Sequence, residues 1–389
     1  MPGRFPELVE QRIRNSRVTL DPSTGYLLNT TKSSGKHRDK CFMGKYFSFN
    51  HCLGLGIIVF ALGTAGCHQG LDLQKNKYSE QRELMWTTAT IDVCKNRQAV
   101  EEREAAYKDV WARLDEIAWK MNVFDEKSDV TKVNQAYPQA AAVGQDTYYV
   151  IEQALRFNRL TNGAFDITVW PLMQLWKKAQ TANQLPSEDE IHQVQEAVGG
   201  HQIRLLGGFY VQLLHPATRL DLGGIAAGYA IDEAARIFRA QGIKDFFIDI
   251  GGDIYAGGKN CQGQDWRVGI RDPHDLAKIV DVVHLSDASV TTSGNYSKFM
   301  EIQGKRWSHI INPLTGYPQE DVISATFIAP TGIEGDALAK APSVLGAEKG
   351  LAFVDSLGPG YAVFIISQSP DKKLRKFSSK EYKKFQVNP

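Results

Sequence analysis

Residues 289–318 read SVTTSGNYSKFMEIQGKRWSHIINPLTGYP, and the organisation of the chain can be followed outward from this stretch. The small residues at 291–294 predict a turn, and Gln303-Gly304 predicts a tight connection between two short strands. Turn residues at 312–316 close the segment. His309 lies between these turns, where the second of the two expected strands runs into a loop. Two interpretations stay open from this stretch alone: a proton-transfer residue, or a histidine hydrogen-bonded at a strand end.

The composition is that of a well-cored globular protein. The 389 residues are 43% hydrophobic and 23% charged, which allows one large domain or two ordinary ones. The net charge is +1 and no block of Lys and Arg alternates with aromatic residues, so nucleic acid is not an expected partner. The five cysteines have no C-x-x-C spacing, which excludes the common zinc and thioredoxin-like motifs.

The N-terminal part predicts export. Residues 1–42 are polar and basic, so we expect them to be disordered or to be an extension upstream of a start at Met43. Residues 43–67 have a lysine, an apolar run and small residues before Cys67, the three-part layout of a secretory signal. The end of this segment resembles a lipoprotein cleavage box, which predicts lipidation of Cys67; an uncleaved membrane anchor is the alternative. Residues 68–81 read as a linker, and residues 82–385 as the folded domain.

Helices and antiparallel strands are mixed through the folded part. The expected helices are at 101–121, 147–161, 186–198 and 225–240, and a further one at 337–345 opens with Asp336 as its cap. The expected strands are at 84–94, 202–214 (a hairpin), 245–250, 266–270, 280–285 and up to Pro330. This order argues for an α+β fold rather than a doubly wound sheet. Double glycines at 223–224 and 251–252 fit either an anion site or tight turns.

Several motifs, taken in order, resemble the ApbE family of flavin transferases, which move FMN from FAD onto a threonine of a target protein. They are Gly163-Ala-Phe-Asp-Ile-Thr168, Leu220-Asp-Leu-Gly-Gly-Ile225, Gly228-Tyr-Ala-Ile-Asp232, Ile250-Gly-Gly-Asp253, Thr292-Ser-Gly294, Ser308-His-Ile-Ile-Asn-Pro313 and Asp336-Ala-Leu338. The resemblance covers residues 82–365. It implies a single ApbE-like, T-fold-related domain with antiparallel sheets and flanking helices.

The resemblance also implies a site. The residues that match FAD-binding positions are Met85, Phe124, Ala164, Phe165, Asp166, Asp221 and Ile310. The carbonyl of Gly224 and the carboxylate of Asp336 match Mg²⁺ ligands, and His309 matches the base that takes the proton of the target threonine. Hard cations prefer such oxygen ligands, and Mg²⁺ on the pyrophosphate would neutralise the departing phosphate.

Two positions depart from the family pattern. Ala227 stands where lysine is usual, and Lys340 stands where the usual residue is a threonine that binds Mg²⁺. Lysine has three donors and no acceptor, so it is a poor metal ligand and a good phosphate partner. Either Lys340 supplies the positive charge that is absent at Ala227, or the metal site is weakened.

Three functions follow as hypotheses. The first is an FAD:protein FMN transferase that releases AMP, lipid-anchored on the periplasmic side of a bacterial inner membrane. Its targets would be flavoproteins of membrane electron-transport complexes. The second is an FAD pyrophosphatase that yields FMN and AMP, and the third is a flavin-binding lipoprotein without catalysis.

Overall fold

The computed structural model describes residues 77–94, 100–295, 299–368 and 373–387, together with strand residues 18–20 and 27–29. Within residues 1–42, β1 (Val18–Leu20) and β2 (Leu27–Asn29) pair as short antiparallel strands, and the other residues of this segment are not described. The signal segment at 43–67, with Cys67, lies outside the described residues, as does the linker up to residue 76. No described helix has the length and apolar character needed to cross a membrane.

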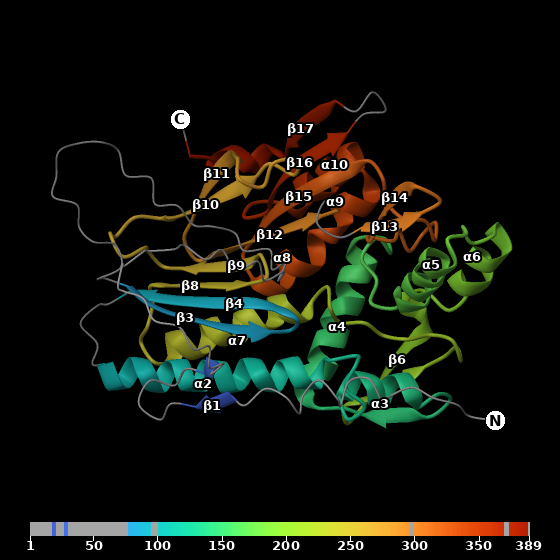
Figure 1. The fold of residues 1–389 in the computed structure, drawn as a ribbon, viewed down its shortest axis with the longest axis horizontal. Coiled ribbons are helices and arrows are strands. Elements are labelled where there is room, and N and C mark those ends of the chain that lie inside the picture. Colours follow the sequence, from blue (N-terminus) through green and yellow to red (C-terminus); the bar gives the residue numbers. More distant parts are fainter. Residues whose placement is uncertain are drawn as a thin grey trace, which may run out of the picture. The chain divides into compact units, whose positions relative to one another are not determined.

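An eight-stranded sheet forms the centre of the domain (Figure 1). Every pair of neighbouring strands in it is antiparallel, which confirms the α+β prediction. Its strands in spatial order are β17 (Leu374–Ser378), β16 (Ala362–Gln368), β15 (Val322–Ala329), β12 (Ala288–Gly294), β9 (Asp253–Gly257), β8 (Phe246–Ile250), β4 (Thr87–Cys94) and β3 (Lys77–Leu84).

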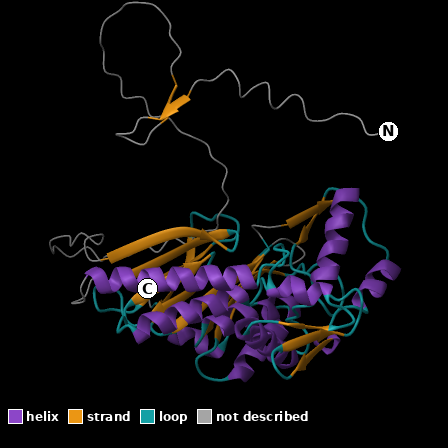
Figure 2. Cartoon of the chain, turned by 90° about the horizontal axis from the view of Figure 1, so that it is seen from below, coloured by secondary structure: helices purple, strands orange, loops and turns teal. Residues whose placement is uncertain are grey.

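Both faces of this sheet are covered. Helices α2 (Val100–Lys120) and α7 (Ala226–Ala240) lie along one face, as the two views of the chain show (Figures 1 and 2). On the other face pack the hairpin β10 (Trp266–Arg271) and β11 (Ile279–Leu285) and the short helix η3 (Lys380–Lys384). In β8, Phe246 is buried with the helices and Phe247 with the hairpin. Because neighbouring strand residues face opposite sides and both sides are covered, all of β8 is buried, and only Asp249 among its five residues is not apolar.

Further helices and short strands complete the domain. They are α3 (Asp129–Gln135), β5 (Ala140–Ala142), α4 (Gln145–Leu160), α5 (Trp170–Ala182), α6 (Glu188–Gln195), η2 (Gly200–Gln202), β6 (Ile203–Leu206), β7 (Tyr210–Leu213), β13 (Phe299–Ile302), β14 (Lys305–Ser308), α8 (Gly332–Leu338), α9 (Lys340–Leu345) and α10 (Ala347–Leu357). A separate core joins α5 and α6 to the β13–β14 hairpin. There, the indole N–H of Trp176 donates to the carbonyl of Gly316 at 2.8 Å.

Three sequence predictions need correction. The small residues at 291–294 are not a turn but the end of β12, which pairs with β9 and β15. Helix α8 packs closely on this strand, since a Cβ at Gly335 would lie 2.5 Å from Ser289 Oγ and 3.4 Å from Thr291 Oγ1. Asp336 does not open a helix, because Thr331 caps α8 and Asp336 lies in its second turn. The strand predicted at 84–94 is a hairpin whose first strand begins at Lys77, inside the predicted linker.

Candidate functional site

A cavity of about 580 Å³ brings four of the predicted residues together. Met85 comes from the turn between β3 and β4, Phe124 from the loop after α2, Asp221 from the loop before α7 and Ala227 from the first turn of α7. Asp253, at the start of β9, also lines the cavity. The volume is in the range of pockets that hold a cofactor-sized ligand.

The mouth of this cavity carries exposed aromatic rings. Trp86 is 84% exposed and Phe124 66%, and their rings meet edge to face at 6.3 Å. Phe124 also meets Trp170 edge to face at 5.7 Å. Such rings offer apolar faces on which a planar ligand can stack. Met85 and Trp86 both have positive φ, at 48° and 62°, which is uncommon for residues other than glycine and is often found at functional sites.

A cluster of charged residues lies beside the cavity. Lys340 Nζ donates to the backbone carbonyl of Asp336 at 2.6 Å and forms a close ion pair with its Oδ1. The other carboxylate oxygen of Asp336 accepts the backbone N–H of Gly228 at 3.1 Å. Burial and the neighbouring Asp336 raise the pKa of Asp253 to about 7. Burial lowers the pKa of Lys340, but Asp336 and Asp253 outweigh it and the net pKa is raised, so the ammonium stays charged.

Two glycines of the Leu220-to-Asp232 motifs lie at this cluster, and Gly228 is required for it to form. A Cβ at Gly228 would lie 2.2 Å from the carbonyl oxygen of Gly332, so only glycine lets α7 approach α8 this closely. At Gly224 a Cβ would be 3.4 Å from Lys340 Cε and 3.6 Å from the ring of Phe165. The predicted residues Gly224, Phe165, Asp336 and Lys340 are therefore neighbours.

Ala164, Ile310 and His309 do not line the cavity, but the first two meet in a small apolar cluster. Ile310 packs with Ala164 and with Ala341 of α9, and His309 precedes Ile310 directly after β14. Gln319 donates its backbone N–H to the carbonyl of Ile310 at 2.8 Å. Its side chain is 7% exposed, and both amide atoms lack a hydrogen-bond partner within the described residues. Since buried polar groups are normally satisfied, this loop has capacity for a polar ligand.

Asp166 has a local role in the structure. Its Oδ1 accepts from the backbone and hydroxyl of Thr168, at 2.7 and 2.5 Å, and its Oδ2 accepts from Asn158 at 2.9 Å. These bonds hold the turn that carries Ala164 and Phe165. Burial raises the pKa of Asp166, and these bonds to Thr168 and Asn158 oppose that shift.

The residues as they lie do not fit the predicted Mg²⁺. Both carboxylate oxygens and the carbonyl of Asp336 already accept hydrogen bonds, and an ammonium group stands where a cation would have to approach. Among the described residues, no group of three or more His, Cys, Asp or Glu side chains is arranged to hold a metal ion. Magnesium needs near-octahedral oxygen ligands, which an ion-paired carboxylate and one carbonyl do not supply.

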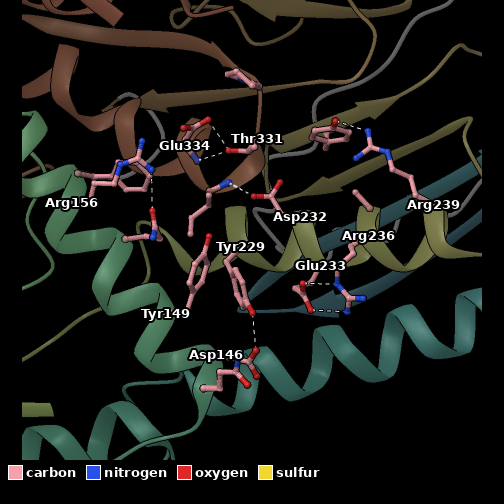
Figure 3. Close-up of a pocket in the computed structure, with 17 residues that line it drawn as sticks. Asp146, Tyr149, Arg156, Tyr229, Asp232, Glu233, Arg236, Arg239, Thr331 and Glu334 are labelled. Atoms are coloured by element: carbon pink, nitrogen blue, oxygen red, sulfur yellow. Dashed lines mark hydrogen bonds and ion pairs between the residues drawn. The ribbon is translucent and has the colours of Figure 1, made fainter. Parts of the chain in front are cut away.

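A larger hollow, of about 770 Å³, lies between α4, α7 and α8 (Figure 3). None of the predicted site residues lines it. Its side chains are engaged with one another: Tyr229 donates to Asp146 at 2.7 Å and Arg236 pairs with Glu233 at 2.8 Å, as the close-up shows. Size alone therefore does not identify the site, and the smaller cavity has the exposed aromatic rings beside buried charge.

Comparison with known proteins agrees with this geometry. Residues 85–365 match the ApbE family. The chain belongs to the ApbE family. An FAD:protein FMN transferase of Treponema pallidum is 32% identical over 339 residues, covering 82% of this chain and 92% of that protein. One from Escherichia coli K12 is 30% identical over 352 residues, covering 86% of this chain and 97% of that protein.

Solved ApbE structures share the fold. The flavin transferase ApbE of Vibrio cholerae superposes with a TM-score of 0.70 at 28% identity, covering 79% of this chain and 99% of that one. The ApbE protein of Thermotoga maritima gives 0.71 at 28% identity, covering 80% and 100%. This confirms the predicted single ApbE-like domain.

Sequence reasoning missed two residues that line the cavity. Asp253 was part of a quoted motif, but no role was predicted for its carboxylate, which becomes significant only where β9 meets α8 and α9. Trp86 was not singled out either. A tryptophan in a two-residue turn between strands was the available signal, because a large apolar residue there is forced into solvent.

Proposed function

We propose that this ApbE-family protein transfers FMN from FAD to a threonine hydroxyl of a target flavoprotein and releases AMP. One observation carries the proposal: a cavity with exposed aromatic rings is lined by Asp253, whose charge interacts with the buried Asp336 and its ion-pair partner Lys340. The rings suit the flavin or adenine of FAD, and the ammonium suits its phosphates. The relatives named FAD:protein FMN transferase support the same reaction.

The reaction is a phosphoryl-type transfer. The threonine oxygen attacks the phosphorus of the FMN half, and an O–P bond forms. The bond from that phosphorus to the bridging oxygen breaks, so AMP leaves with the bridging oxygen and its electron pair. The threonine proton passes to His309, a half-buried imidazole at the end of β14. Positioning and charge supply most of the catalysis in such transfers.

Incubation of the full chain with FAD and a threonine-containing target peptide tests this function. Flavin covalently bound to the peptide, with AMP released in equal amount, is the expected result. Free FMN and AMP without labelled peptide would instead identify an FAD pyrophosphatase. FAD that stays intact on a yellow protein would identify a flavin-binding protein without catalysis.

We further infer a lipid-anchored location on the periplasmic side of a bacterial inner membrane, with targets in membrane electron-transport complexes. The signal-like segment ending at Cys67 supports it. A disulfide between Cys94 and Cys261 adds support, because disulfides persist mainly in oxidising compartments.

The anchor is tested in a bacterial host. The mature chain should begin at an acylated Cys67 and sediment with membranes, since two or more acyl chains anchor stably. Cys67→Ala should block this processing, and mass spectrometry of the N-terminal peptide reads the result. Recovery of an unacylated mature chain from the wild-type protein would contradict the lipid anchor.

A further inference from the structure

Lys340 occupies the position that the predicted metal ion would need. Its Nζ donates to the Asp336 carbonyl at 2.6 Å and pairs closely with Oδ1 of the same residue. The last carboxylate oxygen accepts from Gly228 at 3.1 Å. Asp336 is 1% exposed, so its carboxylate cannot turn into solvent and stays paired with Lys340.

The same ammonium reaches the second residue predicted to bind metal. A Cβ at Gly224 would lie 3.4 Å from Lys340 Cε and 3.9 Å from Nζ, so the end of the lysine side chain lies against the Gly224 backbone. Asp253, which lines the cavity, interacts electrostatically with both Lys340 and Asp336. One cation therefore stands among the oxygen atoms that a divalent ion would otherwise join.

We propose that the Lys340 ammonium is a built-in cation that takes the place of Mg²⁺, so that this chain binds the FAD pyrophosphate without a metal ion. An ammonium has three N–H donors. Within the described part of the chain two of them serve Asp336, which leaves the third for a phosphate oxygen. The inference rests on the proposed function for the identity of the ligand, but the absence of a metal site is a separate claim.

A single ammonium has half the charge of Mg²⁺, which has a consequence for the reaction. It neutralises less of the charge that develops on the departing AMP. The transfer of FMN should therefore be slower than with a bound Mg²⁺. Because Lys340 fills the metal position, the chain should bind FAD in the absence of Mg²⁺, and added Mg²⁺ should not increase the rate of transfer.

The metal claim is tested on the FAD-free full chain with Mn²⁺, which takes the same hard oxygen ligands as Mg²⁺ and is visible by electron paramagnetic resonance. Three variants form a matched set: Lys340→Thr supplies an oxygen and removes the ammonium, Lys340→Met only removes it, and Lys340→Arg keeps a cation. We expect Lys340→Thr to bind Mn²⁺ at least about tenfold more tightly than the wild-type protein and Lys340→Arg. Mn²⁺ bound tightly by the wild-type protein and lost in Asp336→Asn would overturn the inference.

FAD affinity, measured by flavin fluorescence in EDTA and in Mg²⁺, is the second readout. The wild-type affinity should be the same in both, Lys340→Thr should need Mg²⁺, and Lys340→Met should bind weakly in both. A wild-type affinity that rises about tenfold or more with Mg²⁺ would also overturn the inference. If no FAD binds under any condition, the proposed function fails, and the Mn²⁺ result still decides the metal claim. Circular dichroism checks the fold of each variant, and the wild-type measurements decide if a variant does not fold.

Discussion

At the scale of single residues, His309 is the side chain on which the proposed reaction depends most. It follows β14 directly and precedes Ile310, which packs against Ala164. Loss of a positioned general base lowers rates by about 10²- to 10⁴-fold, so we expect His309→Ala to reduce FMN transfer by that amount. FAD affinity should change little, because the imidazole acts on the threonine rather than on the flavin.

A matched control is His274→Ala, since His274 is exposed in the loop between β10 and β11. Both variants are assayed for transfer to a peptide and for FAD binding by fluorescence. If His309→Ala retains turnover within a few fold of His274→Ala, another group accepts the proton.

At the scale of elements, the two-residue turn of the β3–β4 hairpin joins stability to binding. Met85 and Trp86 both have left-handed backbones, which costs about 1–2 kcal/mol per residue when glycine is absent. Asn-Gly is preferred in such turns. Replacing Met85-Trp86 by Asn-Gly should raise the free energy of unfolding by about 1–2 kcal/mol. It should also weaken FAD binding by about tenfold or more, because both side chains line the cavity.

The β13–β14 turn offers the control for this prediction. Gln303 also has positive φ, at 52°, and is followed by Gly304. Gln303→Asn should also raise the free energy of unfolding, but it should not change the affinity for FAD. Urea unfolding measures the free energy of unfolding, and flavin fluorescence measures the affinity for FAD. An unchanged FAD affinity in the Asn-Gly variant would mean that the strained turn does not position the ligand.

The elements also show what sequence reasoning can reach. The β13–β14 hairpin and the capping box at Ser187 were predictable, because each depends on residues close together in the chain. The end of β12 was mistaken for a turn, because small residues are typical of turns. Here they lie in a strand on which α8 packs closely, and α8 is distant in sequence. Family motifs pointed to Met85, Phe124, Asp221 and Asp336. Asp336 and Lys340 are four residues apart, a spacing that brings side chains together on a helix, so their ion pair was within reach of the sequence. The contact of the same carboxylate with Gly228 needed the structure, since α7 is distant in sequence.

At the scale of the whole molecule, some features depend only on the complete topology. Cys94 at the end of β4 and Cys261 after β9 form a disulfide across 167 residues, and no local spacing signals it. The burial of acidic side chains also depends on the complete topology. Asp232, Asp249 and Asp253 come from different parts of the fold, and burial raises their pKa values to about 6, about 7 and about 7.

These aspartates predict an unusual dependence of stability on pH. Each keeps its proton in the folded state above the pH at which the unfolded chain has released it, so the folded state binds more protons between about pH 4 and 7. The free energy of unfolding should therefore fall as the pH rises from 5 to about 7.5. Asp146 behaves in the opposite way, since its hydrogen bond with Arg113 lowers its pKa. Its contribution to the free energy of unfolding is lost only in stronger acid, below this pH range.

Asp249→Asn tests this account at one position. Asp249 is 8% exposed, its Oδ1 accepts the backbone N–H of Gly252 at 2.8 Å, and the nearby Asp92 adds to the effect of burial on its pKa. Asparagine keeps an acceptor for Gly252 and removes the titration. The slope of unfolding free energy between pH 5 and 6.5 should become less negative by up to about 1.4 kcal/mol per pH unit, the value for one proton. The variant should be the more stable protein at pH 7.5. Urea unfolding at several pH values gives both slopes, and parallel curves for the two proteins would show that Asp249 does not hold a proton in the folded state.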